Sequence, residues 1–184
     1  GLGLLFLAEW GLGWLMWRSA TATPSEQKQP AAKLTSILLS TLLLGTWVSV
    51  TEELIFRGFL LNQLQPTYPG WGAAAIASLI FAVLHLVWDG RDTIPQLPGL
   101  WLMGMVLVVA RWVDSGNLGL AWGLHAGWVW AIASFDTTQR FTYTGHGSEW
   151  LTGLKGKPLA GLFGILFLLM TAAVLWQFVP SPQP

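Results

Sequence analysis

Residues 34 to 64 read LTSILLSTLLLGTWVSVTEELIFRGFLLNQL, an apolar stretch in which Glu52 and Glu53 stand side by side and Arg57 follows four residues later. The stretch is longer than the roughly 20 residues that a helix needs to cross a bilayer. Each ionisable side chain at the centre of a spanning helix costs about 2.5 to 3.5 kcal/mol, and the fifteen Leu, Ile, Val and Phe residues from Leu34 to Leu61 roughly offset three such costs. Charged residues that make insertion this marginal are normally retained because they have a function. The stretch therefore predicts a membrane helix with a functional site at its charged residues.

The composition places the whole chain in a membrane. Hydrophobic residues make up 53% of the 184 and charged residues only 10%, against roughly 25% in soluble domains. The thirteen Trp favour the headgroup level or packing between helices, and membrane lipids are the first partners to expect. A net charge of zero without a basic run argues against nucleic-acid binding. With no Cys, the chain has no disulfide, thiol nucleophile or cysteine metal site.

The predicted fold is all-α: a polytopic transmembrane helical bundle, with about six spanning helices in a single integral membrane domain over residues 1–184. The apolar segments cover residues 1–17, 34–64, 71–88, 97–113, 118–135 and 159–179. The connections between them are a polar linker (19–33), a tight turn (65–70), a loop (89–96), a short turn (114–116) and a polar loop (136–157). The chain begins without Met inside an apolar segment, which we interpret as a fragment with room for helices upstream, and not as a signal peptide.

The loop charges predict an orientation. If the six segments alternate in direction, one side receives only Arg111 and the other receives seven basic residues: Arg18, Lys28, Lys33, Arg91, Arg140, Lys155 and Lys157. Seven against one is the positive-inside pattern. The linker after the first segment and the 136–157 loop should therefore face the cytoplasm or its organellar equivalent, such as stroma.

Two of the three histidines fall inside apolar segments, at His85 and His125. Glu52 lies 16 residues before Tyr68 and His85 lies 17 after it, so a helical hairpin about this turn brings both to a similar depth. His125 falls near the middle of its own segment. We therefore expect Glu52, His85 and His125 to approach one another in a single intramembrane cavity. His146 lies in a glycine-flanked loop and is interpreted as an ordinary loop residue.

Helix geometry divides the roles of the two glutamates. Glu53 and Arg57 are four residues apart with Glu first, the favourable order for an ion pair on one helix face. Glu52 is rotated by about 100° from Glu53 and can face a cavity as a base. Phe81 stands one turn before His85 and is expected to fix the orientation of its ring.

Glycines recur every four residues beside His125, at Gly119, Gly123 and Gly127. They predict a smooth face for close helix packing, which would leave His125 to point the other way into a polar centre. Each feature has a plainer interpretation, because an intramembrane His is often a packing residue and a Glu-Arg pair can simply hold a bundle together. Their conjunction favours function.

The residues in this order resemble the CAAX prenyl protease and bacteriocin-processing group of glutamate-dependent intramembrane endopeptidases, often labelled abortive-infection proteins. Glu52, Glu53 and Arg57 match its Glu-Glu-x-x-x-Arg motif, and Phe81 and His85 match its Phe-x-x-x-His motif. The third motif, a His followed four residues later by Asn or Asp, is matched only by its His, at position 125, because position 129 is Val. The resemblance covers about residues 34–135.

The resemblance implies that Glu52, helped by His85, activates a water that attacks a peptide carbonyl, while His125 and the missing amide stabilise the oxyanion. Val129 offers no hydrogen bond. Either another donor substitutes, with the indole N–H of Trp128 or Trp130 as candidates, or this member is catalytically weak or inactive.

The main hypothesis is thus an intramembrane endopeptidase acting on a membrane-associated protein or peptide, without a cofactor. Zinc is not expected, because the chain has no His-Glu-x-x-His motif. A second hypothesis is a non-proteolytic partner or assembly subunit of a larger membrane complex, a photosynthetic one included, which Val129 and the many Trp favour. A third, less favoured, is pigment or cofactor ligation by His85 or His125. Plasma membrane and thylakoid membrane both stay open.

Overall fold

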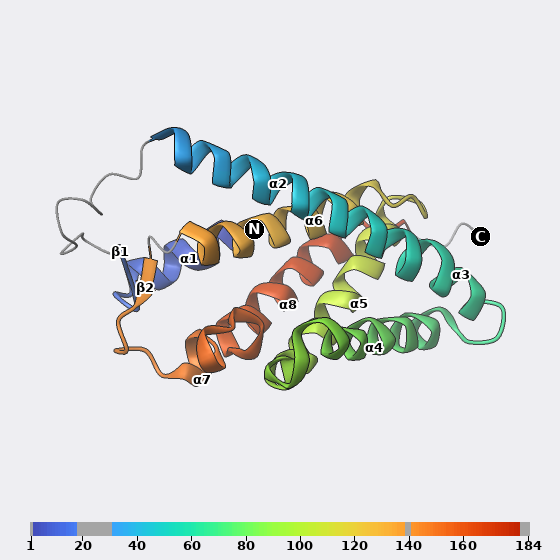
Figure 1. Cartoon of the computed structure of the whole chain (residues 1–184). Coiled ribbons are helices and arrows are strands. Elements are labelled where there is room, and N and C mark those ends of the chain that lie inside the picture. Colours follow the sequence, from blue (N-terminus) through green and yellow to red (C-terminus); the bar gives the residue numbers. More distant parts are fainter. Residues whose placement is uncertain (1, 18–30, 139–140, 181–184) are drawn as a thin grey trace.

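The computed structural model describes residues 2–17, 31–138 and 141–180 (Figure 1). It has the predicted all-α architecture, with one short pair of strands. The α-helices are α1 (Leu2–Gly11), α2 (Ala31–Glu53), α3 (Leu61–Leu64), α4 (Gly70–Asp89), α5 (Leu97–Val113), α6 (Gly119–Thr138), α7 (Glu149–Thr152) and α8 (Leu162–Trp176). A π-helix, η1 (Leu54–Leu60), joins α2 to α3, and the short 3-10 helices are η2 (Gly90–Gln96), η3 (Leu154–Gly156) and η4 (Pro158–Ala160). The strands are β1 (Leu15–Trp17) and β2 (Phe141–Tyr143).

Three helical stretches within the described residues are long and apolar enough to cross a membrane: Lys33–Leu64, Gly70–Val87 and Gly90–Val113. A shorter apolar helix, Leu162–Trp176, packs with them. The chain is therefore a membrane protein built as a helical bundle. The α2, η1 and α3 elements form one continuous helical path across the outside of the bundle (Figure 1).

The first apolar segment differs from the single helix expected over residues 1–17. Its helix ends at Gly11, and the chain turns at Gly13, whose φ of +73° suits glycine. Strand β1 then pairs antiparallel with β2, Leu15 lying opposite Tyr143. Burial raises the pKa of the Tyr143 hydroxyl, which stays protonated and donates to Glu9 Oε2 at 3.2 Å. Pairing between strands so distant in the sequence could not be predicted from local periodicity.

The connections follow the prediction in part. The tight turn is confirmed, because α3 ends at Leu64 and α4 begins at Gly70. The predicted 136–157 loop contains the end of α6, then β2, α7 and η3, and its Lys155 forms an exposed ion pair of 2.9 Å with Asp92. The predicted linker over 19–33 lies outside the described residues up to residue 30, as do the basic residues Arg18, Lys28 and Arg140.

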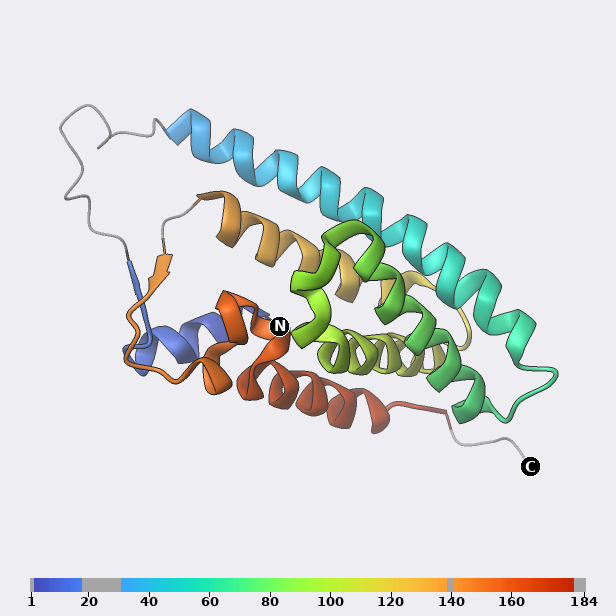
Figure 2. The ribbon, with the colours of Figure 1, turned by 60° about the horizontal axis from the view of Figure 1, so that its bottom comes forward.

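Helix α5 forms the centre of the bundle. Figure 2 shows α8 on one side of it and α6, with α2 beyond, on the other. Its buried side chains include Met103, Val106, Leu107, Val108 and Ala110. Its glycines permit close contact, since a Cβ on Gly104 would lie only 2.7 Å from the Ser78 Cβ of α4. Small residues at such crossings are how membrane helices approach one another.

Helices α2 and α6 run side by side, but not through the predicted glycine stripe. Gly119, Gly123 and Gly127 are exposed, and a Cβ on either of the last two would meet no atom within 4 Å. That prediction was wrong because the close contact is made by a glycine of the opposite helix. A Cβ on Gly45 of α2 would lie 3.1 Å from the backbone nitrogen of Trp130.

Polar contacts reinforce the α2 and α6 pair. The Thr41 and Ser134 hydroxyls lie 2.8 Å apart. The indole N–H groups of Trp122 and Trp130 donate to backbone carbonyls of α2, at Thr46 and Leu38 respectively. These contacts hold α6 beside the helix that ends in the two glutamates.

Candidate active site

The second glutamate is buried inside the bundle and is paired through one oxygen, Oε1, whereas its Oε2 has no hydrogen-bond partner in the described structure. Arg57 Nη1 donates to Glu53 Oε1 at 3.0 Å, and both side chains are 1% exposed. Arg57 Nη2 also donates to the Gly104 carbonyl of α5 at 3.3 Å, and its guanidinium lies 4.4 Å from the centre of the Phe81 ring. The predicted Glu53 and Arg57 ion pair is confirmed, and the two buried charges neutralise each other.

His125 lies between the two carboxylates. Its Nδ1 is 2.8 Å from Glu53 Oε1 and its Nε2 is 3.5 Å from Glu52 Oε2, while its side chain is 2% exposed. An ionised carboxylate only accepts hydrogen bonds, so Nδ1 carries the proton directed at Glu53. Nε2 is then a hydrogen-bond acceptor in the neutral ring and a hydrogen-bond donor in the imidazolium. His125 is thereby fixed in orientation by one glutamate and presented to the other.

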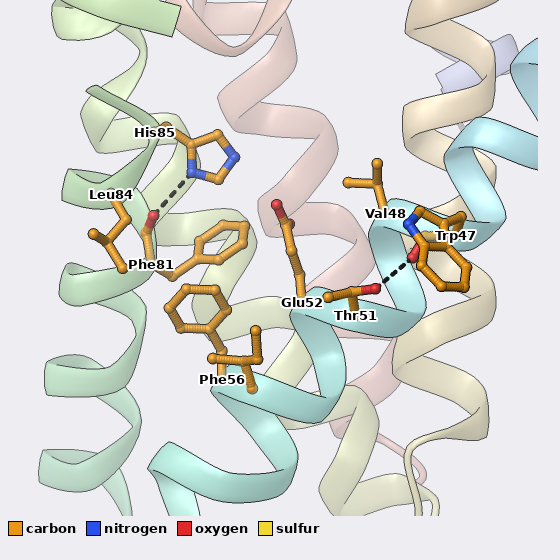
Figure 3. Close-up of a pocket in the computed structure, with 9 residues that line it drawn as sticks. Trp47, Val48, Thr51, Glu52, Phe56, Phe81, Leu84 and His85 are labelled. Carbon is orange, nitrogen blue, oxygen red and sulfur yellow. Dashed lines mark hydrogen bonds between the residues drawn. The ribbon is translucent and has the colours of Figure 1, made fainter. Parts of the chain in front are cut away.

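His85 approaches the first glutamate from α4. Its Nδ1 lies 2.9 Å from the Phe81 carbonyl oxygen, and because a carbonyl can only accept, Nδ1 is the protonated nitrogen. The Phe81 ring packs edge-on against the imidazole with centroids 4.6 Å apart. Figure 3 shows the Glu52 carboxylate and the His85 ring extending into the same space between α2 and α4. His85 therefore keeps Nε2 available as an acceptor beside Glu52.

Two cavities meet at Glu52, whose side chain is 21% exposed. The smaller, of about 300 Å³, is almost wholly apolar and is lined, besides Glu52 and His85, by Trp47, Val48, Thr51, Ile55, Phe56, Phe81 and Leu84 (Figure 3). The larger, of about 580 Å³, contains Glu52, His85 and His125 together. The expectation that these three side chains share one cavity is met in the larger one.

The larger cavity also contains the site of the missing amide. Val129, one turn after His125, lines it together with Trp128. Trp130 is not among its lining residues, and the Trp130 N–H is already bonded to the Leu38 carbonyl. Of the two indoles predicted as substitute donors, only Trp128 therefore faces the cavity. His146 is exposed in the loop before α7 and lines neither cavity at Glu52.

Three polar residues of the larger cavity were not predicted from the sequence as part of the site: Gln96, Asp136 and Lys157. Gln96 ends η2, Asp136 lies near the end of α6, and Lys157 directly precedes η4. They come from segments assigned to loops, so their only signal was a position at the expected positive side. Within the described ranges, no three His, Asp or Glu side chains are arranged to hold a metal ion.

The arrangement provides a carboxylate open to a cavity, two oriented imidazoles and a neutralised second carboxylate. Such a set can remove a proton from a water and return it to a leaving group. Its ion pair is buried at Glu53, whereas the Glu52 side chain is partly exposed to the cavities. These orientations of the two glutamates are the ones predicted from helix geometry.

Comparison with known proteins identifies a family for most of the helical core. A family model described as type II CAAX prenyl endopeptidase Rce1-like matches residues 34–131. An uncharacterized 24.3 kDa protein of Escherichia coli is 33% identical over 91 residues, which cover 48% of this chain and 40% of that protein. The chain therefore spans less than half the length of this relative. No solved structure matches significantly.

Proposed function

The chain belongs to the type II CAAX prenyl endopeptidase Rce1-like family, and from this premise we propose that it is a glutamate-dependent intramembrane endopeptidase. The observation that carries the proposal is the contrast between the paired Glu53 and the accessible Glu52, which lies with His85 and His125 in one cavity. Two adjacent carboxylates in different environments can take different roles. Glu53 forms the structural ion pair, and Glu52 is left available as an acid or base.

In the proposed reaction, Glu52 and His85 orient a water and accept one of its protons as the oxygen attacks the peptide carbonyl carbon. The resulting tetrahedral intermediate collapses with cleavage of the C–N bond. The proton held by Glu52 is returned to the departing amine, which leaves a carboxyl product and a free amine. General base catalysis of this kind contributes roughly 10² to 10⁴-fold.

His125 stabilises the oxyanion in this scheme as an imidazolium, donating from Nε2 while Nδ1 stays bonded to Glu53. Val129 cannot supply the second donor. The Trp128 indole and the Gln96 carboxamide line the same cavity and are the candidate replacements. Because loss of one oxyanion donor costs about 10² to 10³-fold, turnover without a replacement would be low but measurable.

The two cavities suggest how a substrate lies across Glu52. The larger one extends to Lys157 and Asp136, at the end of the bundle predicted to face the cytoplasm or stroma. The smaller one offers an apolar wall to a side chain or lipid group. A membrane-associated peptide would enter from the positive side of a plasma or thylakoid membrane and place its scissile carbonyl between the cavities.

Turnover of a membrane-peptide library by the purified protein tests the proposal. Glu52→Gln, which keeps the shape but removes the base, should lower cleavage by about 10² to 10⁴-fold. Asp92→Asn is the matched control, because Asp92 is exposed and paired only with Lys155 among the described residues, and it should leave cleavage unchanged. Cleavage that persists in Glu52→Gln would contradict the role of Glu52.

Val129→Asn sharpens the same test. If the protein is a protease with an incomplete oxyanion site, this substitution should raise turnover by up to about 10²-fold, since Val129 already lines the cavity. Val129→Leu is its control, changing volume without adding a donor. An unchanged rate in Val129→Asn would mean that Trp128, Gln96 or another donor already fulfils the role.

The side chain of Val129 in the cavity also favours a second candidate function, that of a non-proteolytic subunit in a membrane complex. In that case neither the parent nor Val129→Asn should cleave any library peptide. Glu52→Gln should then leave the biological role intact, and the protein should purify in fixed stoichiometry with partners. Robust cleavage that depends on Glu52 would exclude a role as partner alone.

A further inference from the structure

Arg111 has no part in the motifs, yet it makes three hydrogen bonds next to the site. From the end of α5, its Nη1 donates to the Arg57 backbone carbonyl at 2.6 Å and its Nη2 to Asn62 Oδ1 at 2.8 Å. Its Nε donates to the Gly116 carbonyl at 2.9 Å, in the turn that leads to α6. One half-buried guanidinium thus contacts the middle of the π-helix, the start of α3 and the turn before α6.

The Arg57 carbonyl needs an outside donor because of how the π-helix ends. The Leu61 N–H donates to the Phe56 carbonyl, five residues earlier, whereas the Gln65 N–H donates to Leu61, four residues earlier. Only the three N–H groups of residues 62–64 then remain for the four carbonyls of residues 57–60, so one of these carbonyls lacks a donor within the helix, and Arg57 is the one to which Arg111 donates. A buried carbonyl without a donor is costly, so a π-to-α transition here requires a partner.

Arg111 also connects the two elements that meet at Glu53. One is η1, which carries Arg57, and the other is α6, which carries His125 and follows directly on the turn that Arg111 contacts. The same turn is ordered by Asp114, whose Oδ2 accepts the Leu120 N–H at 3.1 Å. A shift of η1 relative to the start of α6 would therefore change the distances from Glu53 Oε1 to both of its partners.

We infer that Arg111 is a positioning residue for the Glu52 site: it completes the π-helix at Arg57 and fixes η1 against the start of α6. The inference rests on the proposed function for its kinetic consequence only, because the positioning itself concerns backbone geometry. Arg111 does not line either cavity at Glu52, so it acts through Arg57 and Glu53 and not through substrate.

A cross-linking experiment tests the positioning without any need for activity. The chain has no Cys, so a Gly58→Cys and Leu118→Cys pair can be introduced cleanly, and a Cβ on Gly58 would lie 3.4 Å from Leu118 Cδ1. A short bifunctional thiol reagent should couple this pair efficiently in the parent background and at least about tenfold more slowly with Arg111→Met. A Thr41→Cys and Ser134→Cys pair, whose parent hydroxyls are 2.8 Å apart farther along the α2 and α6 contact, should couple equally in both backgrounds.

Steady-state kinetics supply the second measurement. Arg111→Met should lower kcat by about 10 to 100-fold with KM unchanged, since small misplacements of catalytic groups have effects of this size. Arg111→Lys, which retains one donor, should restore part of the loss. Trp101→Phe is the matched control, because it removes another bond from an α5 side chain to a backbone carbonyl, that of Ala75, away from η1.

The outcomes separate the two proposals. A parent protein that cleaves nothing removes the proposed function but leaves the cross-linking comparison intact. Equal coupling of the Gly58→Cys and Leu118→Cys pair with and without Arg111→Met would overturn the positioning role, as would a kcat in Arg111→Met equal to that of Trp101→Phe. If Arg111→Met cannot be recovered folded, Arg111→Lys takes its place in both measurements, with a smaller but still resolved loss expected.

Discussion

The helical path that carries the two glutamates and the helix at the centre of the bundle are built in opposite ways. In an 18-residue apolar stretch of Lys33–Leu64 only 17% of the residues are buried, against 56% in the corresponding stretch of Gly90–Val113, the span to which α5 belongs. The first path lies on the outside and is attached by individual contacts, from Thr41 to Arg57. The second is surrounded by apolar side chains and close helix contacts.

Under the proposed function, this difference would separate catalysis from stability. The proposed base, Glu52, would be reached on the peripheral helix from the two cavities, which suits a substrate that lies in the membrane. The cost is that its position depends on a small number of bonds to α5 and α6. Substitutions at those bonds should alter the site and, at the buried Arg57, also the free energy of unfolding, whereas substitutions at the apolar and glycine positions of α5 should chiefly alter the free energy of unfolding.

Arg57 is the point where the peripheral path meets α5, and its loss should have the largest effect on stability. Arg57→Ala would leave Glu53 buried and without its cation, at a cost of about 3 to 5 kcal/mol in the free energy of unfolding. Thermal unfolding in detergent measures this. Lys155→Ala removes a cation from an exposed pair and should leave unfolding unchanged. An unaltered unfolding temperature in Arg57→Ala would contradict the structural role of the pair.

Gly104 tests the tightly packed helix. Gly104→Val should cost about 1 to 3 kcal/mol, because even its Cβ would lie 2.7 Å from the Ser78 Cβ. Gly123→Val on α6 is the same change at an exposed helical position with no atom within 4 Å of a Cβ, and it should be close to neutral. Comparable destabilisation by both would show that helix propensity, and not the α4 and α5 contact, determines the effect.

Trp130 tests a single attachment of the peripheral helix. Trp130→Phe keeps the aromatic ring but removes the 3.0 Å bond to the Leu38 carbonyl, and should cost about 0.5 to 1.5 kcal/mol. Trp47→Phe, on a side chain that is 71% exposed, provides the comparison and should have a smaller effect. Chemical unfolding in detergent resolves differences of this size if both variants are measured beside the parent.

Most of the candidate site could be predicted from the sequence, because the signals were short spacings within one helix or equal residue counts on the two sides of a turn. The four-residue spacing fixed the Glu53 and Arg57 pair, and the turn at Tyr68 gave Glu52 and His85 a common depth. The charged residues themselves marked the candidate site, since a bilayer penalises such residues in a spanning helix. The family assignment followed from the same residues.

What could not be predicted depended on contacts between distant segments. The glycines of α6 showed their spacing but not which face meets α2, and Gly45 makes that contact instead. The pairing of β1 with β2 depends on how the ends of α1 and α6 come together. Gln96 enters the cavity because of the fold of η2, and no motif marks it.

Because the segment between Glu53 and Leu61 is a π-helix, the number of residues in it matters for the site, and not only their identity. A helix that closes its hydrogen bonds over five residues uses one more residue than an α-helix along the same path. Deleting Phe59, whose side chain is 65% exposed, would remove little packing and would let the path close as an α-helix, with Leu61 still buried in the core. The Arg57 carbonyl would then find a donor inside the helix, and its bond from Arg111 would no longer be required. The extra residue is therefore what leaves this carbonyl available to α5.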